Sequence, residues 1–315
     1  MAAIPSIKLN TGAEIPAIGL GGTPDGFTPE DMAACEKWFL TAFEVEEAGY
    51  RHFDTAWMSG TEPSLGAALR ASGVPCGEVF ITTKLAWHHQ KYVERAFNDS
   101  LNRLGVDYVD LYLMHWPQHL EYPTGYDFPP TLEEIWGGWK LNEEHTFNDT
   151  WAEMEPLHAS GKARAIGVSN FSIKTLEQLF KTAKIVPAVN QVEMHPYHAD
   201  TELLEYCDKK GIVVTAYSPT GHQKLRSDPV LAGLAEKYRV SPTQIILAWH
   251  VARGVVAIPK SSNAGRQKEN LILPTLSAED VASVTALDRK QRCEAWGKFG
   301  PDGKFLGWTA EQYGW

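Results

Sequence analysis

Short runs of apolar residues recur along the chain, and each is long enough for one fully buried strand but too short for a buried helix. They occupy residues 17–21, 51–54, 79–84, 108–115, 163–169, 188–193, 212–217 and 255–259. The runs therefore predict eight buried strands, and their regular alternation with helical segments implies a parallel sheet.

Segments with helical periodicity separate these runs. In one of them Val93, Phe97, Leu101 and Leu104 recur at helical spacing, and Gly105 follows where a glycine cap belongs. Another opens with the capping signal Ser-Pro-Thr-Gln at 241–244. Eight strand–helix units without a break in composition favour a single (β/α)₈ barrel domain, α/β in class, over residues 1–315.

Two segments depart from this alternation. Residues 7–9 and 15–17 flank Asn-Thr-Gly and predict an N-terminal β-hairpin that plugs the bottom of the barrel. The stretch from Gln118 to Thr150 is rich in Pro, Gly, Tyr and Trp and is too long for an ordinary barrel connection. We expect it to form a long substrate loop at the C-terminal face.

Composition restricts the function classes. With 29 Lys+Arg against 39 Asp+Glu the net charge is −10, which argues against nucleic-acid binding. No apolar run reaches the roughly 18 residues of a membrane span, and the first ten residues lack the apolar core of a signal peptide. These features predict a cytoplasmic protein with no membrane partner, and the lack of coiled-coil heptads makes a monomer the default expectation.

Neither a metal site nor a disulfide scaffold is expected. The cysteines, Cys35, Cys76, Cys207 and Cys293, are far apart in the chain, so we interpret them as reduced and structural. His195 and His198 are close together, but no cysteine or carboxylate cluster accompanies them in the sequence.

Polar residues stand at the ends of the otherwise apolar strands. They are Asp54, Lys84, His115, Ser169, Asn170, Gln191, Tyr217, Ser218 and Lys260. In a (β/α)₈ barrel the C-terminal rim is where active sites lie. Taken singly, Asp54 and Lys84 could form a plain salt bridge, and His115 could be a satisfied core histidine. Together they predict an active site in which His115 hydrogen-bonds a substrate oxygen or exchanges a proton.

A basic cluster follows the last strand. Lys260, Arg266 and Lys268 fall within nine residues that contain no acid, beside hydroxyl side chains. Such a cluster suits a phosphate group, although a solvated basic face remains the alternative. Two familiar motifs are absent: Pro24 breaks the glycine pattern that begins at Gly19, and the sequence at 167–171 lacks the last glycine of a hydrolase elbow.

These residues resemble the aldo-keto reductase family in three stretches. The first is Gly-Tyr-Arg-His-Phe-Asp-Thr-Ala at 49–56 with Glu62, Leu65 and Gly66; the second is Ile-Gly-Val-Ser-Asn-Phe at 166–171; the third is Ile-Pro-Lys-Ser at 258–261 with Arg266, Glu269 and Asn270. Asn-Gln-Val-Glu-Met-His-Pro at 190–196 and Tyr-Ser-Pro at 217–219 are similar too. The resemblance implies a barrel that binds NADPH across its rim and transfers a hydride to an aldehyde or ketone.

The resemblance also implies roles for individual residues. Ser169, Asn170 and Gln191 would hold the nicotinamide carboxamide, and Tyr217 would stack on its ring. Lys260, Ser261 and Arg266 would bind the 2′-phosphate, while Glu269 and Asn270 would meet the adenosine. Other cofactor contacts fall on Gly22, Thr23, Asp54, Ser218 and Ser262. Trp57, Trp87, His115 and Trp116 would line the substrate site.

The main departure from the family lies at position 59. The catalytic set is Asp, Tyr, Lys and His; Asp54, Lys84 and His115 match, but Ser59 stands where the tyrosine is expected, five residues after the aspartate. A serine hydroxyl is a far weaker acid than a phenol, whose pKa is about 10, and it is several ångströms shorter. Loss of a positioned acid typically costs about 10²- to 10⁴-fold in rate.

Three explanations of Ser59 are open. The serine could be a deliberate substitution that stalls turnover so that substrate and cofactor are held together. It could be a natural variant in which His115 or a water bound to Lys84 donates the proton. Or the protein could be a catalytically inactive member that binds NADPH and acts through a partner.

The chain has eleven tryptophans, and most of them map to the expected rim. Nine are assigned to the active-site side: Trp57, Trp87, Trp116, Trp136, Trp139, Trp151, Trp296, Trp308 and Trp315. Trp38 and Trp249 are assigned to helices away from it. This distribution predicts an aromatic pocket that suits a carbonyl substrate with an apolar or planar body, while packing of the loops is the alternative.

Overall fold

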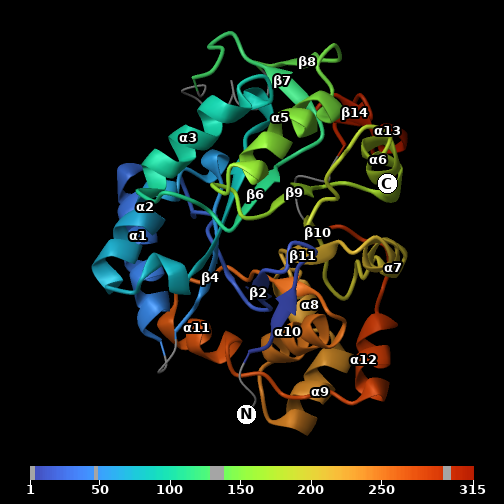
Figure 1. Ribbon diagram of the computed structural model, residues 1–315. Helices are drawn as coiled ribbons and strands as arrows, with labels where there is room; N and C mark the ends of the chain where they lie inside the picture. The colour runs from blue at the N-terminus through green and yellow to red at the C-terminus, as the bar shows by residue number, and fades with distance from the viewer. Residues whose placement is uncertain (1–3, 46–48, 128–137, 294–298) are drawn as a thin grey trace.

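The computed structural model describes residues 4–45, 49–127, 138–293 and 299–315 (Figure 1). Its central element is an eight-stranded sheet in the order β12-β11-β10-β9-β6-β5-β4-β3, in which all paired strands are parallel. The strands are β3 (Leu20–Gly21), β4 (His52–Asp54), β5 (Phe80–Leu85), β6 (Leu111–Met114), β9 (Ile166–Ser169), β10 (Val189–Glu193), β11 (Val213–Tyr217) and β12 (Val256–Ala257). Each overlaps one of the eight predicted runs.

The sheet closes on itself where the first strand segment meets the last. Ile18 forms a parallel bridge with Ala257. The Gly19 N–H donates to the Ala257 carbonyl at 2.9 Å, and the Ala257 N–H donates to the Ala17 carbonyl at 2.8 Å. These bonds leave neither end strand with an open edge, so the predicted (β/α)₈ barrel is confirmed.

Helices surround the sheet as an outer layer (Figure 1). They are α1 (Pro29–Glu44), α2 (Glu62–Ser72), α3 (Val93–Leu104), α5 (Phe147–Ala159), α6 (Ile173–Leu179), α7 (Thr201–Lys209), α8 (His222–Arg226), α9 (Pro229–Tyr238), α10 (Pro242–Ala252), α11 (Ala264–Asn270), α12 (Ala278–Thr285) and α13 (Ala310–Tyr313). Both capping predictions hold: Gly105 takes the left-handed conformation after α3, and Ser241 and Gln244 form a capping box on α10.

The N-terminal hairpin consists of β1 (Ser6–Lys8) and β2 (Glu14–Pro16), one residue earlier than predicted. Leu9 and Ile15 are buried in a cluster with Phe80, Leu111 and Val256, each of which is the first residue of its barrel strand. The hairpin therefore closes the amino-terminal end of the barrel, as expected.

The prediction of one long loop over 118–150 was wrong in part. An antiparallel pair, β7 (His119–Glu121) and β8 (Lys140–Asn142), lies within it, and α5 already begins at Phe147. The side chains of Leu120 and Leu141 face each other in this pair and give the hairpin an apolar contact with the rim.

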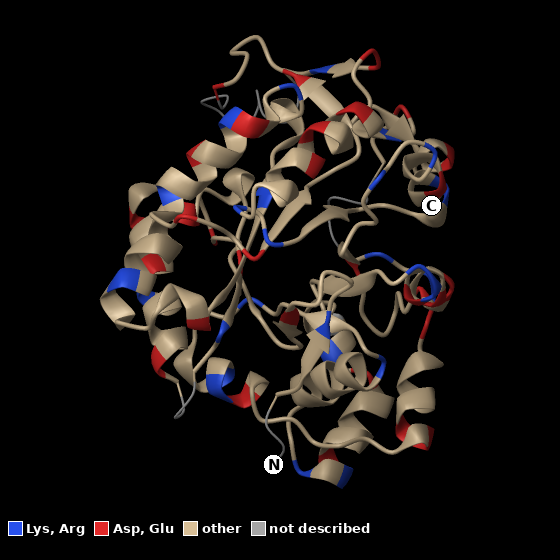
Figure 2. Ribbon diagram, in the orientation of Figure 1, with Lys and Arg blue, Asp and Glu red and all other residues tan. Residues whose placement is uncertain are grey.

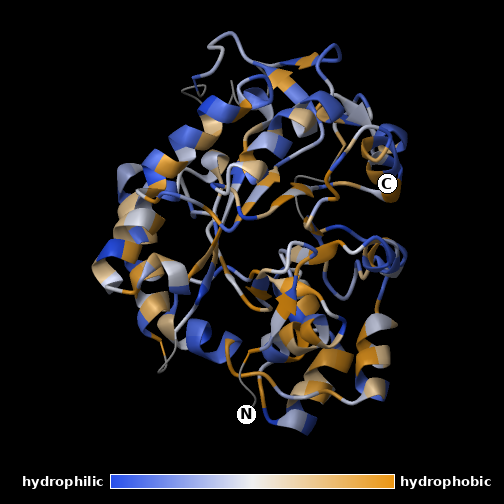
Figure 3. Ribbon diagram, viewed as in Figure 1, coloured by the Kyte–Doolittle hydropathy of each residue, from blue (hydrophilic) through white to orange (hydrophobic). Residues whose placement is uncertain are grey.

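Hydrophobic residues concentrate on the strands and on the inner sides of the helices, and α10 is apolar along most of its length (Figure 3). Acidic and basic residues are interspersed over the outer helices (Figure 2). Among the residues that the structure describes, no helix is both long enough and apolar enough to cross a membrane.

Candidate active site

The central feature of the rim is an ion pair between two neighbouring strands. Asp54 ends β4, and Lys84 lies near the end of β5, whose six residues are all buried. The Lys84 Nζ donates to Asp54 Oδ1 at 2.5 Å and to the Thr55 carbonyl at 2.8 Å, and both side chains are buried. An ammonium group has three N–H donors, so the third N–H of Lys84 can serve a water molecule or a substrate oxygen.

His115 follows β6 on the next strand of the sheet, as predicted. Its backbone N–H donates to the Leu85 carbonyl at 3.2 Å. Burial, together with the nearby charge of Lys84, holds the pKa of the His115 imidazole well below its usual value of 6.5. At neutral pH the ring is therefore uncharged, so it can donate a hydrogen bond to a carbonyl oxygen but carries no surplus proton.

Ser59 ends a short 3₁₀ turn, η1 (Trp57–Ser59), and is half-buried. Gly60 follows in the left-handed conformation and ends the turn. Within the described residues, the hydrogen bonds of the Lys84 ammonium go to Asp54 and Thr55, so the lysine is held without help from position 59.

The residues expected to hold an amide form one connected network. Asn170, at φ 65°, donates from Nδ2 to the Ser169 Oγ at 3.1 Å and to the His115 carbonyl at 3.0 Å. The Tyr217 hydroxyl donates to Asn170 Oδ1 at 2.9 Å, and the Ser169 Oγ donates to the Gln191 carbonyl at 2.8 Å. The network places Asn170 beside His115, and the Gln191 side chain instead donates to Asp54 Oδ2 at 2.7 Å.

The basic cluster after β12 is built on α11. Gln267 anchors this helix from inside, since its Nε2 donates to the Ser261 carbonyl at 2.8 Å and to the Trp38 carbonyl at 2.9 Å. The anchoring leaves Ser262, Arg266 and Glu269 exposed, while Ser261 and Asn270 are buried. Lys260 is paired with a residue that the sequence did not suggest, Asp25, through Nζ–Oδ1 at 2.5 Å.

Gly22 and Thr23 follow β3 on the same rim. A Cβ on Gly22 would lie 2.5 Å from the Asp54 carbonyl oxygen, so this position needs glycine for the close approach of two backbones. Thr23 is exposed beside it. Ser218 follows β11 in the left-handed conformation, at φ 46°. The segment after β3 and the segment after β11 thus both lie at the rim.

The predicted substrate tryptophans separate into two groups. Trp87 and Trp116 are buried in an aromatic cluster with Tyr122, Phe305 and Tyr313, and the Trp87 ring lies 6.2 Å from the His115 ring. Trp139, Trp308 and Trp315 pack against this cluster. Trp57 instead packs against His88 and His89, with ring centroids 5.2 and 4.5 Å away.

The assignment of nine tryptophans to the rim needs one correction. Trp151 is fully buried in the main core, where its Nε1 donates to the Ile185 carbonyl at 3.1 Å. It lies on the inward face of α5, which begins earlier than predicted. Trp38 and Trp249 lie on α1 and α10, as expected. Trp136 and Trp296 are outside the described residues.

Sequence reasoning missed several rim residues. Gln90 ties the hairpin to the barrel, with Nε2 donating to the Trp116 carbonyl at 2.7 Å and to the Gln118 carbonyl at 3.0 Å. Tyr122, by contrast, belongs to the aromatic-rich stretch that the sequence singled out, and it accepts a hydrogen bond from Trp87 Nε1 at 3.0 Å. His88 and His89 lie in a 3₁₀ turn, η3 (Trp87–His89), just after β5, and that position after a strand end was the one available signal.

The rim of this barrel gathers a buried Lys–Asp pair, a neutral histidine, a network of amide and hydroxyl groups and the exposed Arg266, a set of groups that fits an oxidoreductase. Residues 18–289 match the Aldo/keto reductase family, and the chain belongs to that family.

The relatives agree with this assignment. The chain is 43% identical over 295 residues to glycerol 2-dehydrogenase (NADP(+)) of Saccharomyces cerevisiae, covering 90% of this chain and 91% of the relative. It is 40% identical to aldehyde reductase YPR1 of the same yeast, covering 90% and 91%. An aldo-keto reductase of Bombyx mori, solved in complex with NADP, superimposes with a TM-score of 0.80 at 33% identity, covering 93% of this chain and 96% of the other.

The residues present fit nicotinamide adenine dinucleotide phosphate. The exposed guanidinium of Arg266 and the ammonium of Lys260 are groups that bind phosphate. The amide and hydroxyl groups of Asn170, Ser169 and Tyr217 can exchange their mutual hydrogen bonds for those of a carboxamide. The donor set thus offers an anion site at one end and an amide site beside His115 at the other.

Proposed function

We propose that this protein is an NADPH-dependent oxidoreductase that reduces an aldehyde or ketone to an alcohol, and that its turnover is low because Ser59 replaces the general-acid tyrosine. The observation that carries the proposal is the buried Lys84–Asp54 pair beside the neutral His115 at the rim. Family membership and the NADP-linked names of the relatives support it.

Lys260, Ser261 and Arg266 would hold the 2′-phosphate, Glu269 and Asn270 the adenosine, and Ser169, Asn170 and Gln191 the carboxamide beside Tyr217. Gly22, Thr23, Ser218 and Ser262 would border the same molecule. When bound, the cofactor supplies the hydride. The contribution of this chain is to orient the substrate carbonyl and to stabilise the negative charge that develops on its oxygen.

His115 and Lys84 perform that task. The neutral imidazole donates a hydrogen bond to the carbonyl oxygen and so orients it. Asp54 fixes the position of the Lys84 ammonium, whose positive charge acts on the surroundings of His115 and would stabilise negative charge on the same oxygen. Both effects stabilise an alkoxide without supplying a proton.

The proton must come from another group. The neutral His115 has no surplus proton, since its pKa lies well below 6.5. A water molecule on the third N–H of Lys84 is therefore the donor that this arrangement favours. Such a water is a weaker acid than a phenol, which accounts for low turnover rather than none.

The test is restoration of the tyrosine. Ser59→Tyr should raise the rate of NADPH consumption with aldehydes at least about tenfold, within the general-acid range. Ser59→Phe is the matched control, because it fills the same space without a hydroxyl and should give no gain. An equal gain in both variants, or none in Ser59→Tyr, would remove the assignment of position 59.

Ser59 itself favours one alternative, a catalytically inactive NADPH-binding protein that acts through a partner. Binding and turnover separate the two proposals. Tight NADPH binding with no turnover on a panel of aldehydes, in both the unaltered chain and the Ser59→Tyr variant, would favour the inactive protein.

The aromatic cluster around Trp87 and Trp116 restricts the substrate class. Its walls favour a carbonyl compound with an apolar or planar body, and Trp faces also stack on sugar rings. A panel that compares aromatic aldehydes with short polyol aldehydes in the Ser59→Tyr variant would identify the class.

A further inference from the structure

Three residues with metal-binding side chains meet at the carboxyl end of β10. Glu193 ends this strand, His195 follows two residues later, and Cys293 reaches the same place from the segment after α12. One ligand atom of each lies within 4.8 Å of the other two. His195 Nε2 is 3.1 Å from Glu193 Oε1, and the backbone N–H of Cys293 donates to the same oxygen at 2.5 Å.

These donors form a set that zinc prefers. Zn²⁺ binds carboxylate oxygen, imidazole nitrogen and thiolate sulfur in tetrahedral geometry, at about 2.0–2.3 Å. Tetrahedral ligand atoms at those lengths stand roughly 3.3–3.8 Å apart. The three side chains therefore need to close by about 1 Å to surround an ion, which rotamer adjustment of a half-buried cysteine can provide.

Further imidazole nitrogens lie beside the cluster. The His195 nitrogen that faces Glu193 is Nε2, while its Nδ1 and both ring nitrogens of His198 are buried without a hydrogen-bond partner among the described residues. His195 is completely buried, and His198 is 9% exposed. Buried polar atoms in folded proteins are usually paired with protein, water or an ion.

The ligand types in the cluster are compatible with a divalent cation. A carboxylate and a thiolate supply two anionic ligands, and an imidazole supplies a neutral one.

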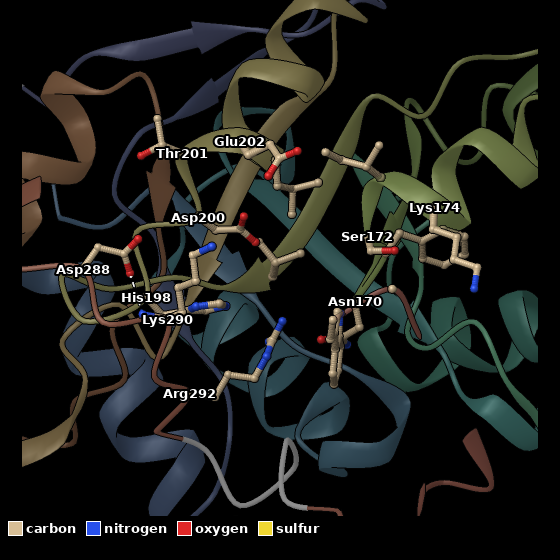
Figure 4. Close-up of a pocket in the computed structure, with 16 residues that line it drawn as sticks. Asn170, Ser172, Lys174, His198, Asp200, Thr201, Glu202, Asp288, Lys290 and Arg292 are labelled. Atoms are coloured by element: carbon tan, nitrogen blue, oxygen red, sulfur yellow. Dashed lines mark hydrogen bonds between the residues drawn. The ribbon is translucent and has the colours of Figure 1, made fainter. Parts of the chain in front are cut away.

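The positive charge of Arg292 opposes cation binding at this site, since its Nη1 lies 3.8 Å from Glu193 Oε2. The carboxylate of Glu193 and the thiolate of Cys293 balance the charge of Zn²⁺, so the positive charge of Arg292 is not compensated by these ligands. Its guanidinium also stacks on the Trp315 ring at 3.9 Å and reaches into the neighbouring cavity, so it can leave Glu193 without losing its other contact (Figure 4).

We propose that Glu193, His195 and Cys293 form a zinc-type metal site, with water as the fourth ligand, that joins the end of β10 to the C-terminal segment of the chain. A cavity of about 920 Å³, lined in part by His198, Arg292 and Asn170, lies beside the site. His198 and Arg292 project into that cavity in Figure 4.

The site would act on the substrate side of the rim. Cys293 precedes Phe305 and Tyr313 in the chain, and these two residues form part of the aromatic cluster around Trp116. A metal bond from Cys293 to β10 is a cross-link that holds this C-terminal segment in place. The site itself does not depend on the reductase proposal, because it uses none of the residues assigned to NADPH or to catalysis.

The test uses the full-length protein after removal of metal with a chelator. Titration with Co²⁺ should give a thiolate-to-cobalt absorption band that saturates at one ion per chain and is displaced by Zn²⁺. Cys293→Ser should abolish the band and weaken Zn²⁺ binding at least about tenfold. Cys76→Ser, which removes another half-buried cysteine, should change neither. A band that persists in Cys293→Ser, or no band in the unaltered chain, would overturn the proposal.

A second measurement needs no variant. Zn²⁺ should slow alkylation of Cys293 in the unaltered chain at least about tenfold and leave the rate at Cys76 unchanged, both read by peptide mass spectrometry, since a metal-bound thiolate is shielded from reaction. Equal rates with and without Zn²⁺ at Cys293 contradict the site even where Cys293→Ser fails to fold.

Discussion

The side chain of Gln191 donates a hydrogen bond to Asp54 Oδ2 at 2.7 Å, and this bond joins two strands that are not neighbours in the sheet. Lys84 occupies the other oxygen of the same carboxylate. Asp54 is thus held from both sides, and the position of the Lys84 ammonium depends on a residue across the barrel. Gln191 therefore supports the ion pair, in addition to the carboxamide contact that the family resemblance implies.

A first prediction concerns this bond. Gln191→Glu places a second carboxylate beside Asp54, so the pKa of the new group is raised in the folded state above its unfolded value of about 4.3. Below that pH the new carboxyl group is protonated in both states and does not destabilise the folded protein. As the pH rises through the folded pKa, the folded protein becomes less stable, because the unfolded chain loses this proton first. The melting temperature of the variant should fall increasingly below that of the unaltered protein between pH 5 and pH 8.

Gln191→Met is the control for that measurement. It removes the hydrogen bond without adding charge, so its deficit in melting temperature should be the same at both pH values. A deficit of Gln191→Glu that does not change with pH would show that the two side chains are not in contact.

Arg266 should determine the choice of cofactor. Because a 2′-phosphate distinguishes NADPH from NADH, Arg266→Ala should weaken NADPH binding about tenfold or more, a typical effect of losing a charged hydrogen-bonding partner. NADH binding should change far less. Fluorescence titration with both dinucleotides measures this, and Lys181→Ala, at an exposed position before β10, serves as a neutral control. Equal loss for both dinucleotides would contradict a 2′-phosphate site.

The pairing of Lys260 with Asp25 predicts an effect of the opposite sign. Asp25 is exposed, and an exposed ion pair contributes only about 0.2–1 kcal/mol. Asp25→Asn releases Lys260 for the phosphate and should tighten NADPH binding by up to about fivefold, the equivalent of 1 kcal/mol. Isothermal titration should show no change for Asp107→Asn, an exposed aspartate elsewhere. Weaker binding in Asp25→Asn would show that Asp25 itself helps to hold the cofactor.

His250 should make stability depend on pH. Burial is the main cause that lowers its pKa to about 3, against a smaller opposing effect of its hydrogen bond to the Pro219 carbonyl. Above its unfolded pKa of about 6.5 the ring is neutral in both states. As the pH falls below that value only the unfolded chain binds the proton, so stability is lost by up to about 1.4 kcal/mol per pH unit.

His250→Gln keeps a donor for Pro219 but cannot titrate. Urea unfolding at pH 6 and pH 5 should therefore show a shallower loss of stability in this variant, by up to about 1.4 kcal/mol per pH unit. His222→Gln, at an exposed position, should follow the unaltered protein. Parallel curves for His250→Gln and the unaltered chain would count against a buried neutral ring at this position.

The barrel could be predicted because its strands are buried on both faces, and such strands are visible as continuous apolar runs. The β7–β8 pair could not, because it is three residues long on each side and is held by contacts such as Gln90 to the Trp116 carbonyl. Trp151 was misplaced for a related reason: its position depends on where α5 begins, and the capping box of Thr146 and Asp149 lies within the segment interpreted as a loop.

The sequence predicted some parts of the candidate site and missed others. Strand ends locate Asp54, Lys84 and His115, because parallel strands bring their carboxyl ends to one rim. Contacts between distant segments carry no such pattern. Cys293 meets Glu193 although 100 residues separate them in the chain, and Asp25 meets Lys260 across 235. The lack of a cysteine near His195 and His198 in the sequence therefore did not predict which residues surround them in the folded chain.

The bridge between Ile18 and Ala257 limits when the barrel can close during synthesis of the chain. The two sides of the basic rim belong to opposite ends of the chain, with Asp25 contributed by the beginning and Lys260 by the last strand unit. During synthesis on the ribosome the barrel stays an open sheet until residue 257 has emerged from the exit tunnel. Assembly of this part of the rim therefore has to wait until both the first and the last strand of the barrel have been made.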